Sequence, residues 1–131
     1  MAARLAVVTG GAGDIGQAIA RRLLRDHDAV LLADRDLALA EDAARDLGPG
    51  CTAIRVDVTD PASCADLAAA AAGAGGVATL VNNAGAAAAV SLHGTDAASW
   101  QADRALNLDA AYYVFSALAD QLAAHRGSVI N

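Results

Sequence analysis

The sequence predicts an α/β fold, built on a parallel β-sheet with helices over both faces. Five short, β-branched apolar runs alternate with four longer stretches of helical periodicity, which is the pattern of repeated strand–helix units. The short runs are continuously apolar, as is typical of parallel strands buried on both faces. The predicted strands are 5–9, 29–33, 52–56, 77–81 and 128–131, and the predicted helices are 15–25, 36–47, 61–72 and 97–124.

Local signals support the first two helices. The helix at 15–25 carries its apolar side chains on one stripe, formed by Ile15, Ile19, Leu23 and Leu24. The helix at 36–47 begins at Asp36, a residue type that caps free helix N–H groups. It ends at the glycine–proline–glycine sequence of 48–50, which breaks a helix strongly.

The later elements have boundary signals of their own. The helix at 61–72 follows Asp60 and starts with Pro61, so it has an N-cap and a proline where a helix tolerates one. The helix at 97–124 is the longest, and we expect it to be broken near its start. The alanine-rich run at 84–89 is expected to form a loop after the fourth strand.

Composition limits the classes of partner. The 131 residues are 56% hydrophobic, which is enough to form a core. The formal net charge is −6, which argues against nucleic acid or an anionic membrane as partner. No run is long and apolar enough to span a membrane. Cys51 and Cys64 fit neither a metal site nor a disulfide framework, which favours free thiols in the cytoplasm. The scattered histidines predict no metal site.

A glycine-rich motif stands between the first strand and the first helix. Its spacing, Gly11-x-Gly13-x-x-Gly16, matches the fingerprint of dinucleotide-binding sites in the strand–turn–helix context that the fingerprint requires. Glycine supplies the positive φ of a tight turn, and its missing Cβ lets a pyrophosphate approach the backbone. The free N–H groups of the following helix would then face the phosphates. The alternative is a glycine turn without a ligand.

An acidic residue closes the second strand. Asp34 lies 18 residues after Gly16, where a carboxylate can accept hydrogen bonds from the adenosine ribose hydroxyls and repel a 2′-phosphate. This favours NAD over NADP. Arg35 weakens the preference, because an arginine beside this position can hold a 2′-phosphate. The alternative for Asp34 is a solvated residue at a strand end or helix cap.

Four spaced motifs resemble those of the short-chain dehydrogenase/reductase family. The sequence TGGAGDIG at 9–16 is similar to the family's first motif, and VNNAG at 81–85 resembles the sequence that closes its fourth strand. VDVTD at 56–60 resembles the segment after its third strand. Trp100, followed seven residues later by Asn107, resembles its fourth helix. The motifs occur in the family's order and extend over essentially the whole chain.

The resemblance implies a nicotinamide dinucleotide as cofactor, NAD with NADP not excluded. The glycine motif would hold the pyrophosphate, and Asp34 would bind the adenosine ribose. Asp57 and Val58 would bind the adenine, and the segment 83–85 would border the nicotinamide ribose. The residues expected to bind the cofactor are Gly10, Gly11, Gly13, Asp14, Ile15, Gly16, Asp34, Arg35, Asp57, Val58, Asn83, Ala84 and Gly85.

The first motif departs from the family pattern at one position. Its middle glycine falls at residue 14 in the family's register, and this chain has Asp14 there. A carboxylate near a pyrophosphate repels it, whereas a carboxylate in a first helical turn is favourable to the helix dipole. We therefore expect Asp14 to point away from the phosphates and cap helix N–H groups, with Gly13 supplying the backbone freedom.

The resemblance also implies a catalytic set, of which the chain holds one member. Asn107 would help to hold a water in the proton relay. The family's other members are a serine, a tyrosine and a lysine four residues after the tyrosine, which lowers the tyrosine pKa. The chain has no lysine, and Tyr112 and Tyr113 are followed four residues later by Ser116 and Ala117. By itself the chain is expected to bind cofactor without turning over substrate.

Right-handed crossovers predict the topology. The first two helices lie on one face and the later ones on the other, in a Rossmann-type doubly wound sheet of order 3-2-1-4-5. We expect one dinucleotide-binding domain over 1–131, truncated after the fifth strand and incomplete at its C-terminus. The fourth and fifth strands would then lack helix cover on one face, leaving an apolar patch and an open edge. The resemblance implies that the long helix forms subunit contacts in a homo-oligomer.

Three interpretations follow. The leading one is the N-terminal part of an NAD(P)-dependent oxidoreductase that acts on a small carbonyl or alcohol substrate. The second is a non-catalytic dinucleotide-binding sensor or interaction module. The third is a truncation product that does not fold stably. The first is favoured because the position of the catalytic asparagine, Asn107, is retained.

Overall fold

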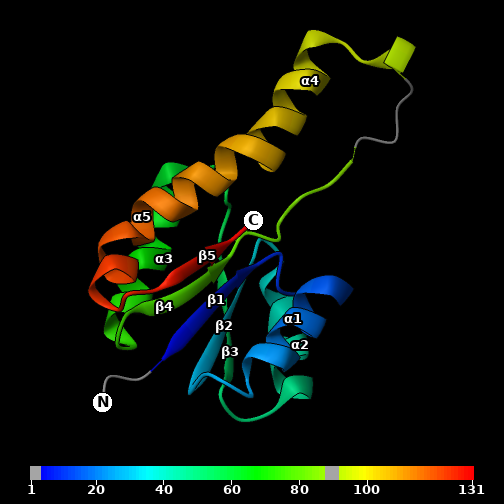
Figure 1. The fold of residues 1–131 in the computed structure, drawn as a ribbon. Coiled ribbons are helices and arrows are strands. Elements are labelled where there is room, and N and C mark those ends of the chain that lie inside the picture. The colour runs from blue at the N-terminus through cyan, green and yellow to red at the C-terminus, as the bar shows by residue number, and fades with distance from the viewer. Residues whose placement is uncertain (1–3, 88–91) are drawn as a thin grey trace.

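A parallel sheet forms the middle layer of the molecule (Figure 1). The computed structural model describes residues 4–87 and 92–131. In this described part the sheet has the order β3-β2-β1-β4-β5, and every pairing is parallel, as predicted. The strands are β1 (Leu5–Thr9), β2 (Ala29–Asp34), β3 (Cys51–Arg55), β4 (Val77–Val81) and β5 (Ser128–Ile130).

Helices cover both faces of this sheet, also as predicted. On one face lie α1 (Asp14–Leu23) and α2 (Leu37–Leu47), and on the other α3 (Pro61–Gly73) and α5 (Ala110–Ala124). The predicted caps are present. The carboxylate of Asp36 accepts from the Leu39 N–H at 3.1 Å, and that of Asp60 accepts from the Ala62 N–H at 3.0 Å.

The long helix predicted over 97–124 changes type along its length. After a short 3₁₀ turn, η1 (Leu92–Gly94), it begins as α4 (Ala97–Arg104), passes through a π-helical turn, η2 (Ala105–Asp109), and continues as α5. The expected break is therefore a π-turn. Figure 1 shows α4 extending past the edge of the sheet. In the expected loop at 84–89, residues 84–87 form no helix or strand, and 88–89 lie outside the described residues.

The core has two parts, one on each side of the sheet, and β1 contributes to both. Leu5 and Val7 pack with α3 and α5, whereas Ala6 and Val8 pack with α1 and α2. All of β1 is buried. Burial of a valine or leucine side chain contributes about 1.5–3 kcal/mol, so β1 is held firmly from both sides. The loop that leaves its carboxyl end therefore starts from a fixed point.

Two strands differ from the prediction of burial on both faces. Residues of β3 are half-buried or exposed, and all three residues of β5 are exposed. Both strands lie at the edges of the sheet, where fewer neighbours cover them. Ile130 is 52% exposed, so the expected apolar patch and open edge are present at β5.

The fourth strand was expected to lack helix cover on one face, yet all five residues of β4 are buried. The segment after α1 provides part of the cover: the His27 Nε2 lies 2.9 Å from the hydroxyl of Thr79, and its Nδ1 lies 3.2 Å from the carbonyl oxygen of Leu23. Val81 packs into the core part under α1 and α2. The His27 ring and the core part under α1 and α2 thus both contribute to the burial of β4.

Within 4–87 and 92–131, no helix has the length and apolar character needed to cross a membrane. The same residues contain no group of three or more histidine, cysteine or acidic side chains placed to hold a metal ion.

Candidate functional site

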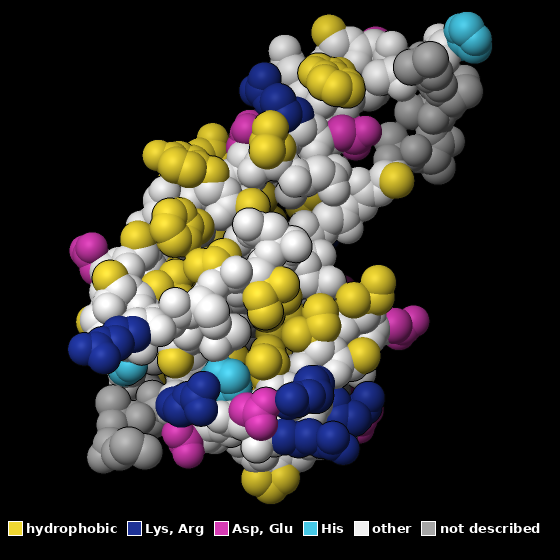
Figure 2. All heavy atoms as spheres, in the orientation of Figure 1, with side chains coloured by type: hydrophobic (Ala, Val, Ile, Leu, Met, Phe, Trp, Pro, Cys, Tyr) yellow, Lys and Arg dark blue, Asp and Glu magenta, His cyan; other side chains and the backbone are white. Residues whose placement is uncertain are grey.

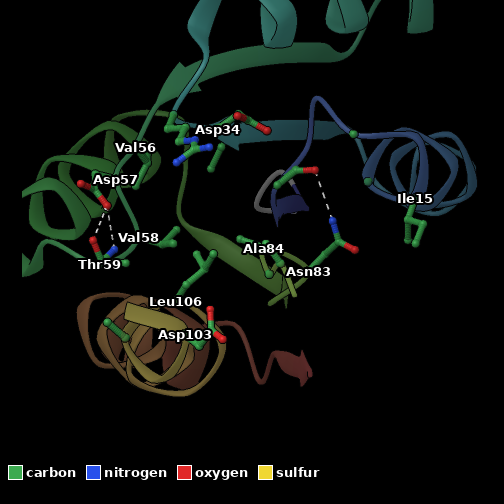
Figure 3. Close-up of a pocket in the computed structure, with 18 of the residues that line it drawn as sticks. Ile15, Asp34, Val56, Asp57, Val58, Thr59, Asn83, Ala84, Asp103 and Leu106 are labelled. Atoms are coloured by element: carbon green, nitrogen blue, oxygen red, sulfur yellow. Dashed lines mark hydrogen bonds between the residues drawn. The ribbon is translucent and has the colours of Figure 1, made fainter. Parts of the chain in front are cut away.

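A cavity of about 870 Å³ opens at the carboxyl ends of the strands (Figure 3). It lies where the strand order reverses, since β1 runs between β2 and β4 and the chain leaves β1 toward one face and β4 toward the other. Such a switch point is where doubly wound sheets bind ligands. The predicted residues that line it are Gly10, Gly13, Asp14, Ile15, Gly16, Asp34, Arg35, Asp57, Val58, Asn83, Ala84 and Gly85.

Some residues differ from the predicted set. Gly11 is not among the lining residues, and Asn107 lines a smaller neighbouring cavity of about 110 Å³. The sequence did not single out the helical side of the large cavity, because no motif marks it. That side is formed by Ala102, Asp103, Ala105 and Leu106.

The glycine loop is shaped by close contacts at three of its four glycines. Gly10 has a φ of +62°. A Cβ on Gly11 would lie 2.7 Å from the Cβ of Leu32, and a Cβ on Gly16 would lie 2.3 Å from the carbonyl oxygen of Gly10. Gly13 differs, with a φ of −74° and 3.5 Å between an added Cβ and its nearest neighbour. The expectation that Gly13 supplies the backbone freedom is therefore wrong; Gly10 supplies it.

Asp14 is the first residue of α1 and is exposed at the cavity wall. Its carboxylate has no hydrogen-bond partner among the described residues, so the expected capping role is wrong. The residue at the N-cap is Gly13, which has no side chain to offer. The described helices α2, α3 and α4 differ here, because each has an aspartate cap. Among the described residues, no side chain caps the first N–H groups of α1.

A buried threonine joins the ends of β1 and β4. Thr9 is 1% exposed, and its hydroxyl accepts from the N–H groups of Asn83 and Ala84, each at 3.0 Å. In return, the Asn83 Nδ2 donates to the carbonyl oxygens of Thr9 at 3.0 Å and Gly10 at 3.2 Å. These bonds fix the two loops that form the cavity floor. Thr9 was missed as a site residue, and the signal for it was a hydroxyl at the end of an apolar strand.

The carboxylate of Asp34 links the glycine loop to α2. Its Oδ2 accepts from the Ala12 N–H at 3.0 Å and its Oδ1 from the Asp36 N–H at 3.0 Å. The two bonds orient the carboxylate at the cavity wall while leaving each oxygen a further lone pair for a ligand hydroxyl. Arg35 beside it is exposed and also lines the cavity.

Asp57 lies on a neighbouring part of the wall, held by the threonine two residues later. It accepts from the Thr59 hydroxyl at 2.6 Å and from the Thr59 N–H at 2.9 Å (Figure 3). These hydrogen bonds, with a smaller contribution from the positive charge of Arg35, hold the pKa of the Asp57 carboxyl below its usual value. The residue is therefore a carboxylate, and an acceptor, at neutral pH.

Asn107 sits in the π-turn and joins that helix to the segment after β4. Its Oδ1 accepts from the Ala86 N–H at 3.2 Å, and its Nδ2 donates to the carbonyl oxygens of Ala86 at 2.8 Å and Asp103 at 2.9 Å. The amide is thus engaged with backbone groups. A Cβ on Gly85 would lie 2.8 Å from the Asn107 Oδ1, so this contact needs the glycine. The water expected at Asn107 stays a prediction.

The two tyrosines lie on α5 outside both cavities. Their rings meet edge to face, with centroids 6.0 Å apart. Tyr112 is 67% exposed and belongs to a row of exposed large apolar side chains with Leu108 and Phe115. Figure 2 shows apolar side chains gathered along the helices at the upper left. We call Leu108, Tyr112 and Phe115 the helix row.

Comparison with known proteins agrees with this geometry. The family model described as short chain dehydrogenase matches residues 4–131. A 2-(S)-hydroxypropyl-CoM dehydrogenase 3 from Xanthobacter autotrophicus is 38% identical over 129 residues, which cover 95% of this chain and 51% of that protein. A galactitol 2-dehydrogenase (L-tagatose-forming) from Cereibacter sphaeroides is 34% identical over 128 residues, with 96% and 50% covered.

A solved structure is similar over almost the whole chain. A metagenomic short-chain oxidoreductase, crystallised in complex with NADP, superposes with a TM-score of 0.88 at 35% identity, covering 98% of this chain and 61% of that one. The chain spans about half the length of the curated relatives it matches.

Proposed function

The chain belongs to the short-chain dehydrogenase family, and we propose that it is the N-terminal, dinucleotide-binding part of an oxidoreductase that transfers a hydride between a nicotinamide cofactor and a carbonyl or alcohol substrate. The single observation that carries this proposal is the cavity at the switch point, whose lining combines the glycine loop, Asp34, Asp57 and the segment 83–85. The domain over 1–131 is incomplete in this proposal, and segments outside the chain supply the rest of the active site.

The residues present fit a nicotinamide dinucleotide. The N-terminus of α1 has no side-chain cap, and Gly10 and Gly16 place no side chain beside it. Its N–H groups and partial positive charge can therefore face a pyrophosphate. Asp34 has lone pairs for ribose hydroxyls, and Asp57 is an ionised acceptor for an amino group. The apolar side chains of Val58 and Leu106 can flank a flat ring.

When bound, the cofactor supplies the carbon that accepts or donates the hydride. The chain's own residues bind and orient it, while Thr9 and Asn83 hold the floor of the cavity in place. Asn107 keeps the segment after β4 against the π-turn, next to the smaller cavity. No residue of this chain forms the tyrosine–lysine pair that the family uses for proton transfer, so the chain alone binds without turnover.

NAD is the proposed cofactor, because Asp34 would repel a 2′-phosphate. The similar metagenomic protein was crystallised with NADP, and the exposed guanidinium of Arg35 leaves room for that alternative here. The proposal places the protein in the cytoplasm, since Cys51 and Cys64 are both free thiols.

The test is a titration of the 131-residue chain with NAD⁺ and NADH by calorimetry, together with an assay for oxidation of simple alcohols. We expect saturable binding that is lost in Asp34→Ala and Gly10→Val, and no turnover. Turnover by the chain alone would contradict the expectation that catalysis requires the tyrosine–lysine pair. Absence of binding in the wild-type chain, with a cooperative unfolding transition that shows it is folded, would contradict the proposed function.

A non-catalytic sensor is the second candidate. The observation that favours it is that Tyr112 and Tyr113 lie outside the two described cavities, in a chain without lysine. The two candidates separate in the complete protein. An oxidoreductase gains turnover when the segments outside this chain are present, whereas a sensor binds the cofactor with no turnover in either form.

We also propose that the helix row is a contact between subunits. Leu108, Tyr112 and Phe115 follow one another at intervals of four and three residues, so they share one helix face, and all three are exposed. An exposed apolar row of this kind favours burial against a second copy.

The change Tyr112→Glu is expected to shift the protein from a dimer or larger assembly to a monomer, because it places a charge in the middle of an apolar contact. Analytical ultracentrifugation measures the outcome. Leu39→Glu is the matched control, since Leu39 is 57% exposed on α2 and outside the helix row; it should leave the assembly unchanged. A wild-type protein that is monomeric at high concentration would contradict the subunit contact.

A further inference from the structure

One charged side chain of the large cavity lies on a wall that no motif describes. Asp103 belongs to α4 and is half-buried where it lines the cavity. Figure 3 shows it across the cavity from Asp34. Its carbonyl oxygen accepts from the Asn107 Nδ2 at 2.9 Å, which ties this turn of the helix to the segment after β4. The backbone of Asp103 is therefore fixed at the cavity wall.

Within the part of the chain that the structure describes, the carboxylate of Asp103 is unpaired. It makes no hydrogen bond and no ion pair with any residue of 4–87 or 92–131. The neighbouring cation, Arg104, is paired instead with Asp109, with 3.4 Å between the guanidinium Nε and the carboxylate Oδ2. The other described residues of the helical wall, Ala102, Ala105 and Leu106, carry no charge that offsets Asp103.

The cavity as a whole has a surplus of negative charge. Its described lining contains four carboxylates and one guanidinium, that of Arg35. Two of the carboxylates, Asp34 and Asp57, accept hydrogen bonds from backbone N–H groups, which spread their charge. Asp14 is exposed to solvent, which screens it. Asp103 is the half-buried member without such bonds, so its field inside the cavity is the least compensated.

A field of this sign acts differently on the forms of a nicotinamide dinucleotide. The oxidised nicotinamide ring carries a positive charge that the reduced ring lacks, and a 2′-phosphate adds about two negative charges. A unit charge acting across a solvent-open cavity about 10 Å wide changes an affinity by about threefold per unit of ligand charge at low salt. The effect grows with each negative charge on the ligand.

We propose that Asp103 is a specificity-determining residue of the cofactor site, which weakens binding in proportion to the negative charge of the dinucleotide and so favours NAD⁺ over NADH and over the 2′-phosphorylated forms. The inference rests on the proposed function, because it assigns a role at the same cavity. It is independent of Asp34, which acts from the strand side at the adenosine ribose, whereas Asp103 acts from the helix side on the charge of the whole ligand.

The experiment compares wild-type, Asp103→Asn and Asp120→Asn in the complete protein that contains this chain. Asp103→Asn keeps the size of the side chain and the carbonyl bond to Asn107. Asp120→Asn removes the same charge from an exposed position on α5 outside both cavities. Calorimetry gives the dissociation constants of NAD⁺, NADH and NADP⁺ at about 0.02 M and about 0.5 M salt.

In Asp103→Asn we expect NADH to gain about threefold and NADP⁺ about tenfold in affinity relative to NAD⁺ at low salt, with both gains shrinking at high salt because salt screens the charge. Asp120→Asn should match the wild type. Equal changes for all three ligands, or weaker binding of all three, would assign Asp103 a direct contact and overturn the charge selection. If the wild-type protein binds none of the ligands, the proposed function fails, and the inference with it.

Discussion

Gly16→Ala is expected to destabilise the fold by about 3 kcal/mol or more and to reduce NAD⁺ affinity by more than about tenfold. The added Cβ would lie 2.3 Å from the Gly10 carbonyl oxygen and 2.9 Å from the Gly11 Cα. Both neighbours are backbone atoms, and Gly11 is pressed against Leu32 behind them, so the loop can yield only by leaving its position under the cavity. Urea unfolding and a cofactor titration measure the two losses.

The control for this change is Gly73→Ala, the same substitution in another helix. Gly73 is the last residue of α3, and an added Cβ there would meet nothing within 4 Å. Alanine is the better helix former, so this variant should gain up to about 1 kcal/mol. The pair separates close packing from helix propensity: if both variants gained stability, the contact of Gly16 with the Gly10 carbonyl would not constrain the loop.

Thr9→Val should cost about 2–4 kcal/mol, although valine has nearly the same shape as threonine. The substitution removes the hydroxyl that accepts from the Asn83 and Ala84 N–H groups, and each backbone donor left without a partner costs about 1–3 kcal/mol. The loss should also loosen the floor of the cavity, so that hydrogen exchange of these two amides becomes faster. Thermal unfolding and amide exchange measure the two effects.

Two variants test whether the hydroxyl is responsible. Thr9→Ser keeps the oxygen and should recover most of the lost stability. Thr52→Val makes the same chemical change at an exposed position of the edge strand β3, where the expected effect is within about 0.5 kcal/mol. If Thr9→Val were as mild as Thr52→Val, the hydroxyl would not hold the strand ends together.

Much of the fold could be predicted because its signals are local. The ends of β1 and β4 and the caps at Asp36 and Asp60 each depend on residues next to them in the chain. The exposure of β3 and β5 could not be predicted in the same way. An apolar run has the same sequence signature in the middle of a sheet and at its edge, and only the assembled strand order decides how many neighbours cover it.

The candidate site could likewise be predicted only where a local motif marks it. The glycine motif, Asp34 and Asp57 were predicted to lie together because a motif marks each, and apart from Gly11 they all line the cavity. The roles within the motif were assigned less well. A pattern of glycines does not tell which of them has a positive φ, so Gly13 was chosen where the structure has Gly10. Asp103 carries no motif at all, since it reaches the cavity through the packing of α4.

The π-turn at Ala105–Asp109 sets the rotational phase between α4 and α5. A π-turn holds one residue more than an α-turn, and each residue of an α-helix advances the chain by about 100° around the axis. Deleting one residue from the turn would turn α4 by about that angle relative to α5. Asp103 would then swing off the cavity wall while the buried face of α5 stayed against the sheet. The extra residue thus sets the angle between the two helices. With it, α5 packs its buried face on the sheet while α4 places Asp103 in the lining of the large cavity.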